Sequence, residues 1–427
     1  MAYPYPSEQP GEFWVTYTRQ VAALYERAGQ PFPDAGGEAF RWFSRPAYDI
    51  GAGMEPEAAR VKHLRGLEEG LGLVPPAPPI QRLHRSGRWL RREDGTRFLW
   101  QGVSGFGLLY RLRESEDDVV WYLDWARAQE RNVVRVFTTA ANLFDLSPDA
   151  GLSLLPRLCG LAAARGIYIE AVAIIDSAVR AYDTQGHLDR VRGMVETTPN
   201  LLVEGGNELM PLHETQSEAG RNRVWRYAGV TGGVYAQGST HNGSDDSAVL
   251  GGGDYVPVHF DRSDGENGWR WVRHTKEGWD LSEATWKFVV NDEPRRDDLD
   301  RDRQFALGAL CRICGLGDTF HYDGGRYWML PTPEEQSALD ERQHGWTLVG
   351  HHGLDDGNFK NAGWSDSPIK SFDTTAALRC YSRVNGGRGV TLVLGVTGDP
   401  QIEWQHGWST YGAIVDRPTT RLLAIQR

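Results

Sequence analysis

The feature that most constrains the fold is a regular recurrence of short apolar runs along the middle of the chain. Eight such runs begin near Phe98, Val133, Ile167, Leu201, Gly233, Tyr255, Phe288 and Thr319. Most successive starts are 31 to 35 residues apart, enough for a strand, a loop, a helix and a second loop. Helix-like patterns fill most of the intervals, at 118–129, 152–164, 187–196, 265–277 and 301–315. The pattern predicts an α/β chain folded as a closed parallel (β/α)8 barrel, the TIM barrel.

One interval departs from this pattern. The fifth and sixth runs start only 22 residues apart, and segment 241–253 between them has a loop-like composition, so we expect a vestigial or missing helix there. The rival fold is a doubly wound open sheet. Eight repeats fit it less well, and no G-x-G-x-x-G motif follows the first run.

Composition shifts divide the 427-residue chain into three predicted parts. Residues 1–80 carry helical apolar spacing and end in the proline-rich stretch 74–80, whose prolines make a stiff linker. Residues 81–345 hold the barrel. In residues 346–427 the pattern changes to short strand-like runs separated by Gly and Pro, which predicts a small C-terminal β module.

Charge and cysteine content exclude several classes of function. The chain has 46 basic and 57 acidic residues, a net charge of −11, so we expect no nucleic-acid partner and a neutral substrate. Four cysteines are too few for a disulfide framework. Cys311 and Cys314 form a C-x-x-C inside a helical segment, where we expect them to be core neighbours rather than zinc ligands.

The chain shows no sequence signal for a membrane. Its start, MAYPYPSEQPGEF, has no basic or apolar leader region, and the longest apolar stretch, IYIEAVAII, is too short to span a bilayer. We therefore expect no signal peptide, no membrane partner and a cytoplasmic location, although the compartment stays open. The sequence does not indicate an oligomeric state.

Carboxylates end two of the apolar runs. The fourth run gives Leu201-Leu-Val-Glu-Gly-Gly-Asn-Glu208, and the seventh gives Phe288-Val-Val-Asn-Asp-Glu293. Active sites of such barrels lie at the carboxyl ends of the strands, and strands four and seven face each other across the mouth. Two carboxyl groups flanking one bond are what glycoside hydrolysis requires: one donates a proton and the other attacks. We therefore predict that Glu208 and Glu293 are catalytic.

This arrangement resembles clan A of the glycoside hydrolases, the retaining barrel enzymes that include cellulase-like and mannanase-like families. The resemblance rests on Asn207-Glu208 after strand four, Glu293 after strand seven, and the segments 95–103 and 132–137, and it covers roughly residues 84–330. It implies a divergent retaining hydrolase that cleaves β-glycosidic bonds of a neutral oligo- or polysaccharide by double displacement, without a metal or other cofactor.

Roles for individual residues follow from the resemblance. It implies that Glu208 is the general acid/base and Glu293 the nucleophile. It implies that Asn207 binds the 2-hydroxyl of the sugar and that Arg135 holds Glu293 ionised, because a guanidinium lowers the pKa of a nearby carboxyl group. The polar floor of the site would be completed by His259 on strand six and by His321 or Tyr322 on strand eight.

The chain also departs from the clan at two positions. Strand six reads Val256-Pro-Val-His-Phe260, without the tyrosine that many members place beside the nucleophile. Strand eight ends in Phe320-His-Tyr-Asp323, where many members have a tryptophan that stacks on sugar. Four other tryptophans could serve as stacking platforms, although the core is the more common place for an aromatic side chain; they are Trp100, Trp269, Trp271 and Trp328.

Two alternatives remain open. A metal-dependent barrel hydrolase could use His259 and Asp261 with His321 and Asp323, which occupy equivalent positions on strands six and eight. A non-catalytic carbohydrate-binding or structural barrel could use the N-terminal part for docking into a larger assembly. The sugar, the linkage, and the choice between endo and exo action are not fixed by the sequence.

Overall fold

The fold was analysed in a computed structural model of the chain. The structure describes residues 11–31, 60, 63, 64, 67, 79–140, 143–175, 183–207, 233–239, 252–260, 269–351, 378–385, 388–395, 412–417 and 421–426. Segment 241–253, where we expected a missing helix, lies almost entirely outside the described residues.

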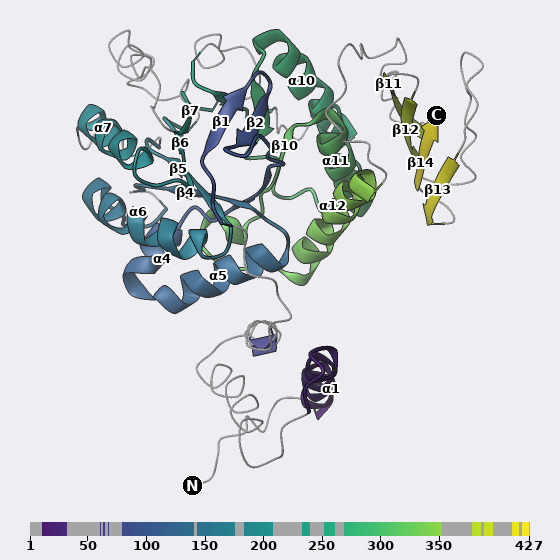
Figure 1. The fold of residues 1–427 in the computed structure, drawn as a ribbon, viewed down its shortest axis with the longest axis horizontal. Helices are drawn as coiled ribbons and strands as arrows, with labels where there is room; N and C mark the ends of the chain where they lie inside the picture. The colour runs from purple at the N-terminus through teal and green to yellow at the C-terminus, as the bar shows by residue number, and fades with distance from the viewer. Residues whose placement is uncertain are drawn as a thin grey trace.

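Eight parallel strands form a barrel, as the sequence predicts (Figure 1). They are β3 (Gln101–Ser104), β4 (Val133–Phe137), β5 (Tyr168–Val172), β6 (Leu201–Glu204), β7 (Val234–Ala236), β8 (Tyr255–Pro257), β9 (Phe288–Asn291) and β10 (Gly317–Phe320). Their hydrogen-bonded order is β7-β6-β5-β4-β3-β10-β9-β8. Between the two end strands, the amide of Asp254 donates to the carbonyl of Tyr235 at 2.6 Å, which brings the ends of the sheet together.

Helices follow most of the strands and pack around the barrel (Figure 1). They are α4 (Leu108–Glu114), α5 (Glu116–Ala128), α6 (Pro148–Ala163), α7 (Thr184–Val195), α10 (Trp269–Thr285), α11 (Arg301–Cys314) and α12 (Pro333–His351). The side chains of Ser115, Ser147, Asp183 and Asp300 accept a hydrogen bond from the first turn of α5, α6, α7 and α11, respectively. Gly315 ends α11 at φ 69°, a left-handed conformation that costs glycine little.

The amino-terminal end of the barrel is apolar. A hairpin of β1 (Leu83–Ser86) and β2 (Trp89–Arg92) packs there, with Leu83 and Leu90 against Trp100, Phe288 and other buried side chains at the starts of the strands. Phe98 belongs to the same hydrophobic cluster, which closes the amino-terminal end of the barrel and is called its floor below. The first barrel strand therefore begins at Gln101 rather than near Phe98, because the apolar residues before it plug the barrel instead of pairing in the sheet. Hydrophobic side chains thus fill the inside of the barrel at this end.

Each of the two terminal parts contains regular structure of the predicted type. Helix α1 (Gly11–Arg27) buries one apolar face, including Tyr17 and Val21, against Leu67. An antiparallel sheet near the C-terminus has the order β11-β12-β14-β13 and comprises β11 (Leu378–Asn385), β12 (Arg388–Gly395), β13 (Gly412–Arg417) and β14 (Arg421–Gln426). The domain boundaries stay a prediction, and α12 runs past residue 345 to His351. Among the described residues, no helix has both the length and the apolar content that crossing a bilayer requires.

Candidate active site

The guanidinium of Arg135 lies at the centre of the carboxyl-terminal end of the barrel. This buried side chain projects from β4 and contacts two stretches of the chain, one at the end of β6 and one after β9. Its Nη2 lies 2.8 Å from Glu204 Oε2 at the end of β6 and donates to Asn207 Oδ1 at 2.7 Å. Its Nε lies 2.8 Å from Asp292 Oδ2 just after β9, and its Nη1 donates to Glu293 Oε2 at 3.0 Å. One cation thus holds together the ends of strands that are distant in the sequence.

Glu293 is the most exposed acid of this group. Its side chain is 13% exposed, whereas the side chains of Glu204 and Asp292 are fully buried and that of Arg135 is 1% exposed. His259, which follows β8, is fully buried, and its Nε2 lies 3.2 Å from Asp292 Oδ1 and 3.7 Å from Glu293 Oε2. The buried side chains of Arg135 and His259 therefore both contact Glu293, while part of the Glu293 side chain stays accessible.

A further acid lies deeper in the barrel. Glu170 on β5 is fully buried and pairs in register with Arg135 on β4. The hydroxyl of Tyr255 on β8 donates to Glu170 Oε1 at 2.8 Å. Oε2 of Glu170 has no hydrogen-bond partner among the described residues. We refer to Arg135, Glu170, Glu204, Asp292 and Glu293 together as the rim cluster.

Burial and charge move the pKa values of this cluster in opposite directions. Burial raises the pKa of Glu204 to about 7, against the opposing effect of Arg135. Burial raises the pKa of Glu170 well above its usual range, and the charges of Asp292 and Glu204 raise it further. Burial also acts to raise the pKa of Asp292, but Arg135 and His259 outweigh it, so the net shift is downward. Asp292, which contacts both Arg135 and His259, is thus the buried acid of this cluster whose pKa is lowered.

The two predicted site residues that directly follow β10, His321 and Tyr322, point to opposite sides. His321 is buried, and its Nδ1 lies 2.7 Å from Ser104 Oγ at the end of β3. Tyr322 instead points into the layer between the barrel and α5, where its hydroxyl donates to the carbonyl of Met329 at 2.7 Å and lies 3.2 Å from the hydroxyl of Tyr122. Of the two alternatives, the structure therefore brings only His321 to the inner side of the barrel.

Trp328 lies in the loop that follows β10. It is half-buried against the core, its ring stacks on Tyr110 at a centroid distance of 5.5 Å, and the guanidinium of Arg111 lies 5.6 Å from it. A sugar-stacking role for Trp328 stays a prediction. Trp100 is fully buried in the floor of the barrel, so its location favours the core interpretation.

The predicted acid/base lies one residue beyond the described part of the fourth barrel strand. Asn207 is the last described residue, and its amide donates to the carbonyl of Ile174 at 2.9 Å. Glu208 lies outside the described residues, so its separation from Glu293 stays a prediction. The side chains of Trp269 and Trp271 also lie outside the described part of the structure.

Of the predicted metal ligands, His259 contacts Asp292 and His321 contacts Ser104. The side chain of Asp323 is 73% exposed and lies 2.7 Å from Arg296, and Asp261 is not described. Oxygens of Glu170, Glu204 and Asp292 lie within 4.8 Å of one another, a spacing that a cation could bridge. Arg135 already supplies positive charge to Glu204 and Asp292. Cys311 and Cys314 are both buried on α11, as the sequence predicts.

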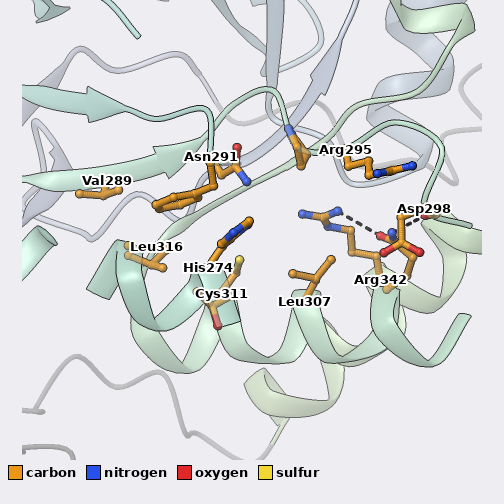
Figure 2. Close-up of a pocket in the computed structure, with 15 residues that line it drawn as sticks. His274, Val289, Asn291, Arg295, Asp298, Leu307, Cys311, Leu316 and Arg342 are labelled. Atoms are coloured by element: carbon orange, nitrogen blue, oxygen red, sulfur yellow. Dashed lines mark hydrogen bonds between the residues drawn. The ribbon is translucent and has the colours of Figure 1, made fainter. Parts of the chain in front are cut away.

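A small cavity lies between β9 and the helices α10 and α11 (Figure 2). Its volume is about 40 Å³, room for roughly three water molecules. Val289 and Asn291 of β9 line it together with side chains of α10 and α11, so it lies between the sheet and the helices. Along β9, Phe288 and Val290 point the other way, into the barrel. This cavity is therefore separate from the barrel mouth and too small for a sugar ring.

Sequence analysis missed Glu170, Glu204 and Asp292. Their signal was present, because each is a carboxylate within or directly after an apolar run, where a buried parallel strand normally has none. What the sequence could not show is that Glu204 and Asp292 share one guanidinium and that Glu170 lies close to both.

Comparisons with known proteins extend the resemblance to the fold. No protein-family model matches the chain, and no curated protein matches it. Among solved structures, a glycoside hydrolase of family 5 from Bacteroides vulgatus superposes with a TM-score of 0.50 at 15% identity, covering 74% of this chain and 81% of that one. A second glycoside hydrolase also gives a TM-score of 0.50 at 15% identity, over 75% of this chain and 84% of the other. The chain thus shares its barrel fold with glycoside hydrolases.

Proposed function

We propose that this protein is a retaining glycoside hydrolase that cleaves β-glycosidic bonds of a neutral oligo- or polysaccharide. Glu293 would act as nucleophile and Glu208 as general acid/base. The observation that carries the proposal is the Arg135–Glu293 pair, with 3.0 Å between Nη1 and Oε2, at the carboxyl end of the barrel. Among the described carboxylates that contact Arg135, Glu293 alone has an accessible side chain.

The first step is attack by Glu293 on the anomeric carbon. Arg135 stabilises the carboxylate form that this step requires, and His259 adds a second contact, from Nε2, at 3.7 Å. Glu208 would donate its proton to the leaving oxygen, and a covalent glycosyl–enzyme would form on Glu293. In the second step Glu208 would take a proton from water, which releases the sugar with retained configuration.

Asn207 has an oriented amide. Its Oδ1 accepts from Arg135 Nη2 at 2.7 Å, which fixes the side chain, and among the described residues no hydrogen bond engages the amide NH₂. A hydrogen bond from that NH₂ to the 2-hydroxyl of the bound sugar would strengthen as charge develops on the ring. The net charge of −11 favours a neutral sugar over a polyanionic one.

The test is a panel of aryl β-glycosides and neutral polysaccharides, with product configuration followed by NMR. Retention of configuration would support the proposal, and inversion would contradict it. Glu208→Gln should slow substrates with poor leaving groups far more than activated ones, because only the former need the acid. Equal losses on both kinds of substrate would contradict the role of Glu208. Complete inactivity of the wild type across the panel would favour a carbohydrate-binding role.

A further inference from the structure

The barrel interior contains a buried acid that the proposed mechanism does not use. Glu170 on β5 is fully buried. Among the described residues, the hydroxyl of Tyr255 on β8 is the one group that hydrogen-bonds it, donating to Oε1 at 2.8 Å, and Oε2 has no hydrogen-bond partner. A charged carboxylate in a protein interior needs a cation or several donors to compensate it. One uncharged hydroxyl gives Glu170 little of either.

The guanidinium on the neighbouring strand is engaged by other acids. Arg135 pairs in register with Glu170, but each of its three side-chain nitrogens contacts another side chain. Nε and Nη2 lie 2.9 and 2.8 Å from Glu204 Oε2. Nε also lies 2.8 Å from Asp292 Oδ2, and Nη1 donates to Glu293 Oε2 at 3.0 Å. The charge of Arg135 therefore acts on Glu170 through space, without an ion pair in the described part of the chain.

The remaining neighbours of Glu170 are acidic or apolar. On β6 its register partner is Leu202, and Glu204 lies two residues farther along the strand. Oxygens of Glu170, Glu204 and Asp292 lie within 4.8 Å of one another. His259, which follows β8, contacts Asp292 instead. Burial and the charges of the two neighbouring acids therefore all favour the neutral form of Glu170.

A proton suits this position better than a metal ion does. Ca²⁺ takes about six to eight oxygen ligands, and Mg²⁺ keeps several of its waters. Oε1 of Glu170 already accepts from Tyr255. A cation would also lie beside the guanidinium of Arg135, which contacts both neighbouring acids and would repel it. A proton neutralises the acid without additional ligands.

We propose that Glu170 is a positioning residue that works as a neutral carboxylic acid, with its proton on Oε2. The proton keeps a further negative charge away from Glu204 and Asp292 and gives them a hydrogen-bond donor as neighbour. The charge of Arg135 is then left for the acids that contact it, among them the proposed nucleophile Glu293. The inference rests on the proposed function, because it takes Glu293 as the nucleophile.

An infrared titration tests this proton without any need for turnover. At pH 9 the wild type should still show the carbonyl band of a protonated carboxyl group, and Glu170→Gln should lack it. The matched control is Glu204→Gln, which should keep the band, because a pKa of about 7 leaves Glu204 ionised at pH 9. Absence of the band from the wild type, its persistence in Glu170→Gln or its loss in Glu204→Gln would overturn the proposal.

Turnover of a dinitrophenyl glycoside tests whether the site needs the neutral form. Glu170→Leu can neither accept from Tyr255 nor donate, so kcat should fall at least about 10-fold while KM changes less than about threefold. Glu170→Gln, whose amide does both, should restore most of this loss. The acid limb of its kcat/KM profile, which reports ionisation of the nucleophile, should coincide with that of the wild type. A limb shifted by about one pH unit would show that the substitution removed a charge, and would contradict the proposal.

A metal ion is the competing explanation, and melting curves separate it from a proton. The Tm of the wild type should be the same in EDTA as in millimolar CaCl₂ or MgCl₂. A cation-dependent rise in Tm that Glu170→Gln does not share would mean that the acids bind a metal, and would overturn the proposal. If the protein hydrolyses no glycoside, the proposed function fails, while the infrared result still decides whether Glu170 holds a proton.

Discussion

Two buried arginine clusters lie at opposite ends of the barrel, and they are built differently. In the rim cluster one guanidinium serves Glu204, Asp292 and Glu293. The second group, the base cluster, consists of Arg131, Asp318 and Arg342. Here Asp318 lies 3.5 Å from Arg131 and 2.5 Å from Arg342, so that two guanidiniums serve one carboxylate.

The base cluster is also the better satisfied of the two. Arg342 donates to Gln304 at 3.0 Å, and Arg131 donates to Gln343 at 2.5 Å. Its residues lie near the amino-terminal ends of β4 and β10 and on α12, where a barrel holds its stability rather than its chemistry. In the base cluster the buried polar side chains have hydrogen-bond partners. In the rim cluster the acids outnumber the guanidinium, an excess of negative charge that the proposed hydrolysis would use.

The largest expected effects are on kcat for a substitution in the rim cluster and on stability for a substitution in the base cluster. Glu293→Gln should lower kcat by at least ~10⁴-fold on an aryl glycoside, because it removes the proposed nucleophile, with little change in melting temperature. Asp318→Asn should leave kcat within about threefold but lower stability by about 3–5 kcal/mol, since two buried cations lose their carboxylate. That corresponds to a fall of about 10 °C in melting temperature. A large loss of kcat in folded Asp318→Asn would break the comparison.

A subtler pair of variants replaces each arginine by lysine. A lysine carries the same charge but lacks the planar fork, so it cannot hold several oxygens at once. Arg135→Lys should therefore lower kcat about 10²-fold through misplacement of Glu293 and Asn207. Arg131→Lys should cost about 1–3 kcal/mol of stability and leave kcat within about threefold. Steady-state kinetics and urea unfolding measure both, and equal kcat values in the two variants would contradict the assignment of Arg135.

Much of the barrel could be predicted from the sequence because its strands are buried on both sides. The apolar runs at Val133, Leu201, Tyr255 and Phe288 coincide with the starts of β4, β6, β8 and β9. The first strand was placed three residues early, because the apolar stretch from Phe98 to Trp100 has the composition of a strand but fills the floor. An apolar pattern shows that a segment is buried, not whether it pairs in a sheet or plugs the barrel.

The sequence predicts which residues lie at the carboxyl ends of the strands, but not how their side chains contact one another. Arg135, Asn207, His259 and Glu293 meet at the carboxyl end because parallel strands bring their ends to one face. How one guanidinium is divided among several acids depends on side-chain directions and on the stagger of the strands, which a single sequence does not show. Tyr322 illustrates the limit, because it follows β10 and its hydroxyl lies beside Met329 and Tyr122, outside the barrel.

The rim cluster should also make stability depend on pH. The folded protein holds a proton on Glu204 up to about pH 7, whereas the unfolded chain releases it near 4.5. Its contribution is therefore complete below pH 4.5 and is lost as the pH rises to about 7. Urea unfolding at pH 5 and pH 8 should show that Glu204→Gln gains about 2 kcal/mol relative to wild type at the higher pH. Arg131→Lys, in the base cluster, should follow the wild-type pH dependence, and a flat difference between Glu204→Gln and wild type would exclude this role.

The smallest expected effect comes from a partly exposed ion pair. It tests whether burial, rather than ion pairing itself, accounts for the contribution of the base cluster to stability. Arg165, which follows α6, holds Asp124 of α5 through two nitrogens, with Nε 2.5 Å from Oδ1 and Nη2 3.3 Å from Oδ2. These side chains are 16% and 23% exposed, so water can solvate either group when its partner is removed. Asp124→Asn should therefore cost less than about 1 kcal/mol in urea unfolding and leave kcat unchanged. A cost equal to that of Asp318→Asn would mean that paired geometry alone, and not burial, sets the stability of the base cluster.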